Sequence, residues 1–201
     1  MLSRFYTLTD HPTGLPKREL FSLESQELPD LDEGEVRIRN HWLSVDPYMR
    51  GRMSGVHTYV APFQLGKPME GGAIGEVIAS NHPNLKVGDK VSHMGGWRDV
   101  AQLPGSGLQA LPDLEVPPQA FLGVLGMPGM TAYFGLLEVG QPKAGDTVLV
   151  SAASGAVGSL VGQIAKIGGC RVVGTVGSAE KVAYCRDELG FDDVIDYRGC
   201  G

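Results

Sequence analysis

The sequence predicts an α/β protein with two domains: an antiparallel, barrel-like β domain over residues 1–118 and the first part of a parallel α/β domain over residues 119–201. Short apolar runs broken by Gly, Pro, Asn and Asp fill the first part, whereas strand-like and helix-like segments alternate in the second. A third observation, a glycine-containing joint between an apolar strand and a helix, predicts a ligand-binding turn in the second domain.

The composition fits a globular protein and argues against several functions. Hydrophobic residues make up 42% and charged residues 20% of the chain, and the net charge is −6. That charge argues against a nucleic-acid binder or a protein bound to anionic membranes, because both need a basic face. No apolar run of about 18 residues and no apolar leader occur, so neither a membrane span nor a secretion signal is predicted.

The cysteine content indicates a reducing compartment. The chain has three cysteines, Cys170, Cys185 and Cys200, and none forms a Cys-x-x-Cys pair. An odd number without such spacing argues against a disulfide framework. We therefore expect a cytoplasmic protein.

Three segments of the first domain have strand character. Residues 35–42 alternate apolar and polar side chains, as a half-buried strand does, and residues 73–79 and 90–92 are further predicted strands. The pattern Lys-x-Gly-Asp-x-Val occurs at 86–91 and again at 143–148, where it predicts a turn that leads into a strand. Two copies of so short a pattern do not indicate a repeat architecture.

The second domain has the order β-α-β-α-β. Predicted strands cover residues 147–151, 171–176 and 194–196, and predicted helices cover residues 129–139, 156–167 and 179–189. Ser178 is the expected N-cap of the last helix, and Gly190 is the expected residue after its end. This order is the mononucleotide-binding half of a doubly wound sheet.

The joint between the strand at 147–151 and the following helix has the pattern Ala-x-x-Gly-x-x-Gly, from Ala152 to Gly158. Gly155 would let the backbone approach a pyrophosphate, and Gly158 would let the helix lie close to the strand. The helix N-terminus would offer free N–H groups to the phosphates. The residues expected to contact them are Gly155, Ala156, Val157 and Gly158. The alternative is a glycine-rich joint without a ligand.

The end of the second predicted strand indicates which dinucleotide is bound. NAD sites usually place Asp or Glu there to hold the adenosine ribose, whereas this strand ends in Thr175-Val176-Gly177 and is followed by Ser178 and Lys181. A small polar residue and a cation suit a 2′-phosphate, so NADP(H) is favoured. Two alternatives stay open: Lys181 as an ordinary solvated lysine, and Glu180 turned toward the ribose.

Several segments together resemble the zinc-independent branch of the medium-chain dehydrogenase/reductase superfamily, which includes leukotriene B4 12-hydroxydehydrogenase/prostaglandin reductases, alkenal double-bond reductases and curcumin reductases. The matching segments are 43–52 (LSVDPYMRGR), 67–76 (KPMEGGAIGE), 126–135 (GMPGMTAYFG), 151–169 and 177–184. The resemblance implies a GroES-like domain followed by a Rossmann domain, with the nicotinamide in the cleft between them. It also implies NADPH-dependent reduction of a carbon–carbon double bond conjugated to a carbonyl.

The resemblance also implies roles for individual residues. Lys181 matches a residue that contacts the 2′-phosphate, and Tyr197 matches a tyrosine near the phosphate on the adenosine ribose. Met127 and Thr131 fall in the segment that lines the nicotinamide side. Residues 155–158 match the phosphate-binding turn of the family.

The residues do not favour a zinc site. Relatives that bind catalytic zinc have Cys where this chain has Asp46, and His where it has Met69 followed by Glu70. A catalytic zinc needs about three protein ligands, commonly Cys or His. The five histidines are scattered without ligand spacing. We therefore expect no metal.

Without a metal, the expected chemistry is hydride transfer from NADPH to the β-carbon of an enone or enal. Charge then develops on the carbonyl oxygen, and a donor must stabilise it. Tyr48 and Tyr59 are the candidate donors, with ordinary packed aromatic residues as the alternative, and Arg50 is a candidate clamp or a structural ion pair. Two other functions stay open: a quinone oxidoreductase of the same superfamily, and an NADPH-binding protein without turnover.

The predicted second domain supplies only the first strands of a doubly wound sheet, which leaves the strand at 147–151 without a partner on one side. We therefore expect a fragment or an incomplete sequence, with little or no reductase activity as 201 residues. By resemblance, the full-length form is expected to be a homodimer that takes a small-molecule enone, enal or quinone.

Overall fold

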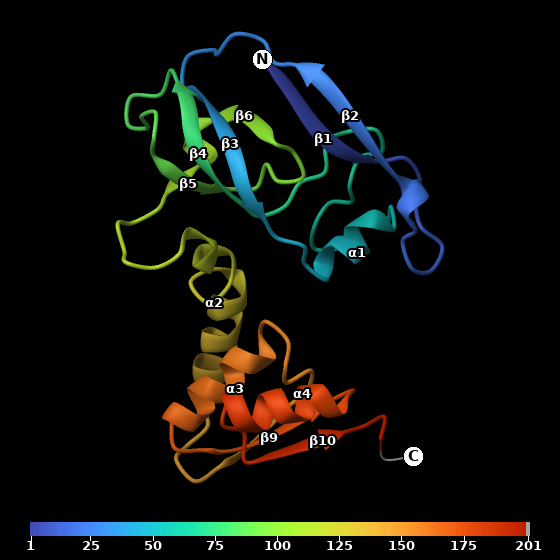
Figure 1. The fold of residues 1–201 in the computed structure, drawn as a ribbon, viewed down its shortest axis with the longest axis vertical. Coiled ribbons are helices and arrows are strands. Elements are labelled where there is room, and N and C mark those ends of the chain that lie inside the picture. The colour runs from blue at the N-terminus through green and yellow to red at the C-terminus, as the bar shows by residue number, and fades with distance from the viewer. Residues whose placement is uncertain (200–201) are drawn as a thin grey trace. The chain divides into compact units, whose positions relative to one another are not determined.

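The computed structural model describes residues 1–199 and divides them into two compact units. The first unit comprises Met1–Leu122, and the second begins at Gly123 (Figure 1). The sequence places the boundary at residue 118. In the structure, Pro118–Leu122 forms the short 3-10 helix η3, which belongs to the first unit and packs against one of its strands.

The first unit is built from antiparallel strands. A hairpin pairs β1 (Leu2–Leu8) with β2 (Phe21–Glu27). A five-stranded sheet has the order β6-β3-β4-β5-β7, with bounds Val100–Pro104, Glu35–Leu43, Ala73–Ser80, Lys90–His93 and Gln109–Ala110. The hairpin is tied to the rest because Tyr6 N donates to Trp97 O at 2.9 Å and Met69 N donates to Tyr6 O at 2.9 Å.

The three strands predicted for this unit are confirmed, whereas β1 was missed. Its inward positions include Ser3 and Thr7, which are both 2% exposed, so the expected apolar alternation is hidden. The Ser3 hydroxyl is satisfied because it donates to Val100 O at 2.6 Å. Buried hydroxyls with a partner are tolerated at such positions.

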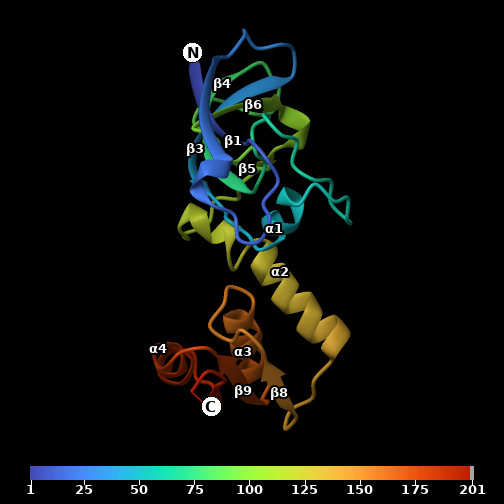
Figure 2. The same ribbon diagram turned by 90° about the vertical axis from the view of Figure 1, so that its right-hand side faces the viewer.

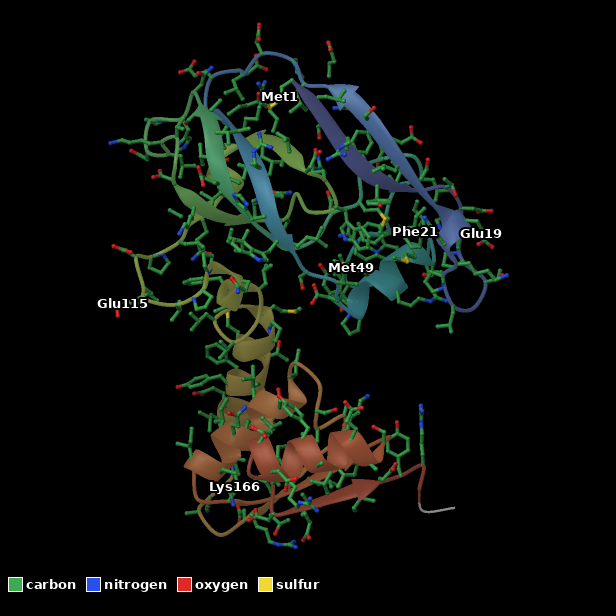
Figure 3. The ribbon with its side chains drawn as sticks, in the orientation of Figure 1. Met1, Glu19, Phe21, Met49, Glu115 and Lys166 are labelled. Atoms are coloured by element: carbon green, nitrogen blue, oxygen red, sulfur yellow. The ribbon has the colours of Figure 1, made fainter. Side chains whose placement is uncertain are left out.

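Two apolar clusters form the core of the first unit. One is formed mainly by side chains of β3, β4 and β5 and contains Val36, Ile38, Val77, Leu85 and Val91. The other lies against the helix α1 (Tyr48–Met53) and contains Leu8, Met49, Met53, Phe63 and Met69. Figure 3 shows Met49 on α1 near Phe21, which packs against this second cluster.

A buried hydrogen-bond network shapes the loop between β5 and β6. Gly95 N donates to His93 Nδ1 at 3.0 Å, so the other ring nitrogen donates to Asn40 Oδ1, at 2.9 Å. Asn40 Nδ2 donates to the carbonyls of Gly95 and Arg98. Trp97 between them adopts φ +58°, a left-handed conformation that these flanking contacts hold in place.

The Lys-x-Gly-Asp-x-Val pattern forms the same turn in both units, as predicted. Asp89 N donates to Lys86 O at 3.0 Å, and Asp146 N donates to Lys143 O at 3.0 Å. Each carboxylate also accepts from the backbone N–H of its lysine. The glycines adopt φ +96° and +92°, which explains why glycine stands at this position.

The second unit is a parallel α/β sheet in the order β10-β9-β8, which confirms the predicted arrangement. The strands are β8 (Thr147–Val150), β9 (Arg171–Val176) and β10 (Asp193–Asp196), and the helices are α2 (Met127–Tyr133), α3 (Gly158–Ile167) and α4 (Ala179–Ala183). Helix α2 continues into the π-helical segment η4 (Phe134–Gly140), as Figure 2 shows, and α4 continues into the π-helical segment η5 (Tyr184–Glu188).

Helix α3 packs against the sheet through small residues. Gly158, Gly162 and Ala165 form its buried face, and a Cβ on Gly162 would lie 2.1 Å from the Phe191 ring. The helix begins at Gly158 rather than at residue 156. Figure 1 shows α3 and α4 on one face of the sheet, as two right-handed crossovers in the same direction require.

Strand β8 is the edge of the described sheet. It pairs only with β9 among residues 1–199, and Leu149 is 68% exposed. The exposed edge agrees with the expectation that this strand has no partner on one side. Among the same residues, no helix is long and apolar enough to cross a membrane.

The buried His93 makes the first unit sensitive to acid. Burial, together with the nearby Arg98, lowers the pKa of His93 from 6.5 to about 4. Between pH 6.5 and about 4, His93 therefore binds a proton in the unfolded chain but not in the folded unit. The contribution of neutral His93 to the free energy of unfolding is therefore fully present above pH 6.5. We expect this free energy to fall by roughly 3 kcal/mol as the pH approaches 4.

The measurement is urea denaturation followed by tryptophan fluorescence, since Trp42 and Trp97 both lie in the first unit. His93→Gln should remove this part of the pH dependence while other titrating groups stay the same. Parallel pH profiles for the wild type and the variant would contradict the assignment.

The contact between Gly162 and Phe191 predicts that Gly162→Ala destabilises the second unit by about 1–3 kcal/mol. Hydrogen exchange of the β9 amides would report the loss of protection. Gly135→Ala is the matched control, because a Cβ there meets no heavy atom within 4 Å. Equal exchange rates in both variants would show that α3 can move away from Phe191 at no cost.

Candidate functional site

The carboxyl ends of the three parallel strands meet at one edge of the second unit. The register places Asp196 beside Val176, so β9 and β10 end together. Ala153 N donates to Thr175 O at 3.2 Å, which brings the turn after β8 to the same edge. Ligands of open α/β sheets bind at this edge, because the loops there are free of sheet pairing.

The turn after β8 is tight, and its geometry explains the small residues. Ala152 adopts φ +48°, the left-handed conformation that costs most residues roughly 1 kcal/mol. A Cβ on Gly158 would lie 2.5 Å from Ala152 O, and one on Gly155 would lie 3.1 Å from the same atom. Gly158 therefore allows the helix to begin directly against the turn.

The same turn presents unpaired donors. Ser159 N donates to Gly155 O and Val161 N donates to Val157 O, which starts α3. Within residues 1–199, the backbone N–H groups of Ala156, Val157 and Gly158 have no hydrogen-bond acceptor. Three adjacent N–H groups at the N-terminus of a ten-residue helix form a site suited to a phosphate.

The residues after β9 and β10 lie at this edge as well. Ser178 is the N-cap of α4, as predicted, and its hydroxyl accepts from Lys181 N at 3.4 Å. The Lys181 side chain is exposed and has no ion-pair partner within residues 1–199. Tyr197 is 59% exposed and its backbone N–H donates to Val176 O. Arg198, which the sequence reasoning missed, follows directly.

Met127 and Thr131 lie one helical turn apart on α2. The Thr131 hydroxyl donates to Met127 O at 2.7 Å, and the Met127 side chain is 49% exposed. The hydroxyl proton is therefore used within the helix, which leaves the oxygen as an acceptor for a ligand. Both residues lie in the second unit.

Tyr48 begins α1 in the first unit and is partly buried. Burial raises the pKa of its hydroxyl, and the nearby Asp46, Glu70 and Tyr59 raise it further, against an opposing effect of Arg52. The hydroxyl therefore keeps its proton at neutral pH and can donate a hydrogen bond. Tyr59 is 89% exposed, so packing does not fix its position.

Arg52 organises the residues around Tyr48, although the sequence reasoning selected Arg50. The Arg52 side chain is 8% exposed, its Nη2 donates to Glu70 Oε2 at 2.7 Å, and its Nε donates to Ala61 O at 2.8 Å. The guanidinium lies 4.1 Å from the centroid of the Phe63 ring. Its position three residues after buried Met49 is the sequence signal, since both face the same side of the helix.

The positions that zinc-binding relatives use have other roles here. Met69 is fully buried in the second core cluster, and the Glu70 carboxylate accepts from Arg52. Asp46 contributes its backbone carbonyl to the start of α1, where it accepts from Met49 N at 3.0 Å. In the part of the chain that the structure describes, no cluster of three His, Cys, Asp or Glu side chains could hold a metal.

Two family models match the chain. The model of the N-terminal domain of oxidoreductases covers residues 4–111, and the model described as zinc-binding dehydrogenase covers residues 156–200. The first match lies in the antiparallel unit, and the second lies in the unit with the parallel sheet. The chain belongs to the medium-chain dehydrogenase/reductase superfamily.

Individual relatives of the chain include reductases. The chain is 47% identical to the NADPH-dependent curcumin reductase of Escherichia coli, in a match that covers 97% of this chain. It is 45% identical to rat prostaglandin reductase 1, in a match that covers 98% of this chain. These matches span 56% and 58% of the two relatives. The chain thus spans little more than half the length of these curated relatives. Their names are those of reductases in the zinc-independent branch that the sequence resembles.

Two solved structures also match this chain over almost its whole length. The crystal structure of CurA from Vibrio vulnificus in complex with NADPH matches with a TM-score of 0.93 and 45% identity, over 98% of this chain and 58% of that one. A quinone oxidoreductase of Pseudomonas syringae matches with a TM-score of 0.76 and 30% identity, over 98% and 59%. The α/β fold class is confirmed.

The contacts of Arg52 predict that it anchors residues 61–63. Phe63 N donates to Arg52 O at 2.9 Å, next to the side-chain contacts with Ala61 and Phe63. Arg52→Met should speed hydrogen exchange of the Phe63 amide by about ten- to a hundredfold, because a hydrogen bond from a charged donor is lost. Arg50→Met is the control on the same helix, since the half-buried Arg50 donates to Gly14 O instead. Equal protection in the two variants would contradict the anchoring role.

Proposed function

We propose that this protein reduces the carbon–carbon double bond of α,β-unsaturated ketones or aldehydes with NADPH and without a metal. The observation that carries the proposal is the row of free N–H groups at Ala156, Val157 and Gly158, beside the end of β9, which has no acid and is followed by Ser178 and Lys181. The names of the reductases that the chain resembles support the same coenzyme and the same reaction.

The second unit has the residues to hold the coenzyme. The turn N–H groups would bind the pyrophosphate, while Ser178, Lys181 and Tyr197 would surround the phosphate on the adenosine ribose. Met127 and Thr131 would line the nicotinamide side. The bound coenzyme would supply a hydride to the β-carbon of the substrate.

Tyr48 is the candidate that the geometry favours for the developing charge. Its protonated hydroxyl would donate to the carbonyl oxygen of the substrate as the enolate forms. The ion pair of Arg52 and Glu70 and the core residue Met49 hold the helix that carries it. Tyr59 stays a second candidate, and its exposure means that substrate would have to order it.

A quinone oxidoreductase is the alternative function. The structural likeness to the Pseudomonas syringae quinone oxidoreductase favours it, and the same coenzyme residues would serve. An NADPH-binding protein without turnover is the third possibility. The cytoplasmic location and a homodimer of the full-length form stay predictions.

The reaction is tested by following NADPH absorbance of the full-length protein with an enal, with a quinone and with neither. We expect oxidation with the enal, and a rate with quinone alone would make the alternative correct. Tyr48→Phe should lower kcat by about a hundredfold or more while coenzyme affinity is unchanged. Tyr59→Phe is the matched control and should keep most of the activity; the reverse result would transfer the donor role to Tyr59.

A further inference from the structure

Gly177 lies where the ends of β9 and β10 approach each other. A Cβ on this residue would lie 2.8 Å from the Tyr197 hydroxyl oxygen and 3.2 Å from Arg198 Nε. A side chain at this position would displace the ends of the Tyr197 and Arg198 side chains. Three residues from two strand ends therefore converge on one point at the carboxyl edge of the sheet.

The Arg198 guanidinium is available for a ligand. Its Cζ lies 5.9 Å from the centroid of the Tyr197 ring, and its side chain is exposed. The neighbouring Asp196 accepts from the Arg198 backbone N–H at 3.0 Å. Within residues 1–199, no carboxylate forms an ion pair with the Arg198 guanidinium.

Three other cations of this unit form ion pairs with carboxylates, whereas Lys143, in the turn before β8, forms none within residues 1–199. The pairs are Lys166 with Asp192, Arg171 with Asp193 and Arg186 with Asp187. Arg171 lies at the amino end of β9, opposite the candidate site. At the carboxyl edge, the positive charges of Lys181 and Arg198 therefore have no internal partner within residues 1–199, whereas Arg171 at the amino end of β9 is paired.

We propose that Arg198 is a second cationic contact for the 2′-phosphate of NADP(H), and that Gly177 leaves the room in which Tyr197 and Arg198 reach it. The proposal rests on the proposed function, since it assigns a specificity-determining residue to that coenzyme. A 2′-phosphate carries a charge near −2 at neutral pH, which one lysine only half balances. The planar guanidinium adds two parallel donors, a geometry that matches phosphate oxygens.

The experiment compares two probes that need only the adenosine end of the site. Adenosine 2′,5′-bisphosphate carries the 2′-phosphate and ADP does not. Isothermal titration of the wild type, Arg198→Met and Arg171→Met would give both affinities. We expect Arg198→Met to weaken the bisphosphate by about ten- to a hundredfold and ADP by less than about twofold. Arg171→Met removes the same charge from the other end of β9 and should change neither affinity.

A second variant tests the space at Gly177. Gly177→Ala should displace Tyr197 and Arg198 and weaken the bisphosphate more than ADP. Combining it with Arg198→Met should add little, because both changes remove the same contact. If Arg198→Met keeps the full preference for the bisphosphate, the role of Arg198 is wrong while the proposed coenzyme stands. If the wild type binds neither probe, the proposed function fails as well.

Discussion

The close packing of α3 against the turn after β8 is the constraint on which the second unit depends. Gly158 lies against Ala152 O and Gly162 lies against the Phe191 ring, so neither position has room for a side chain. This packing aims the helix N-terminus at the carboxyl edge of the sheet. The same packing positions the free N–H groups of the turn among the strand ends.

The first unit depends on two networks of polar contacts. Arg52 joins Glu70 to the carbonyl of Ala61, and a neutral His93 with Asn40 holds the loop that carries Trp97. Both networks are partly buried, and both ring nitrogens of His93 and both polar atoms of the Asn40 amide have hydrogen-bond partners. Buried polar groups with complete partners fix one conformation, because any rearrangement leaves a group unsatisfied.

Much of the fold could be predicted from the sequence, in those segments where the side-chain pattern and the turn chemistry agree. The parallel order and the Ser178 cap follow from local spacing, and the structure confirms both, whereas phosphate binding by the turn stays a prediction. Strand β1 was missed because its inward Ser3 and Thr7 hide the alternation. Arg52 and Arg198 were missed because their partners, Glu70 and Gly177, become neighbours only after folding. The start of α3 was placed too early because the left-handed Ala152 has no sequence signal.

The repeated Lys-x-Gly-Asp turn has a consequence of its own. It begins an antiparallel strand at Lys90 and a parallel strand at Thr147 with the same two contacts, one to a backbone carbonyl and one to a carboxylate. Its geometry is therefore encoded within four residues and does not depend on the neighbouring strands. Such a segment is a self-contained module, which protein designers could graft wherever a loop must be made to enter a sheet of either kind.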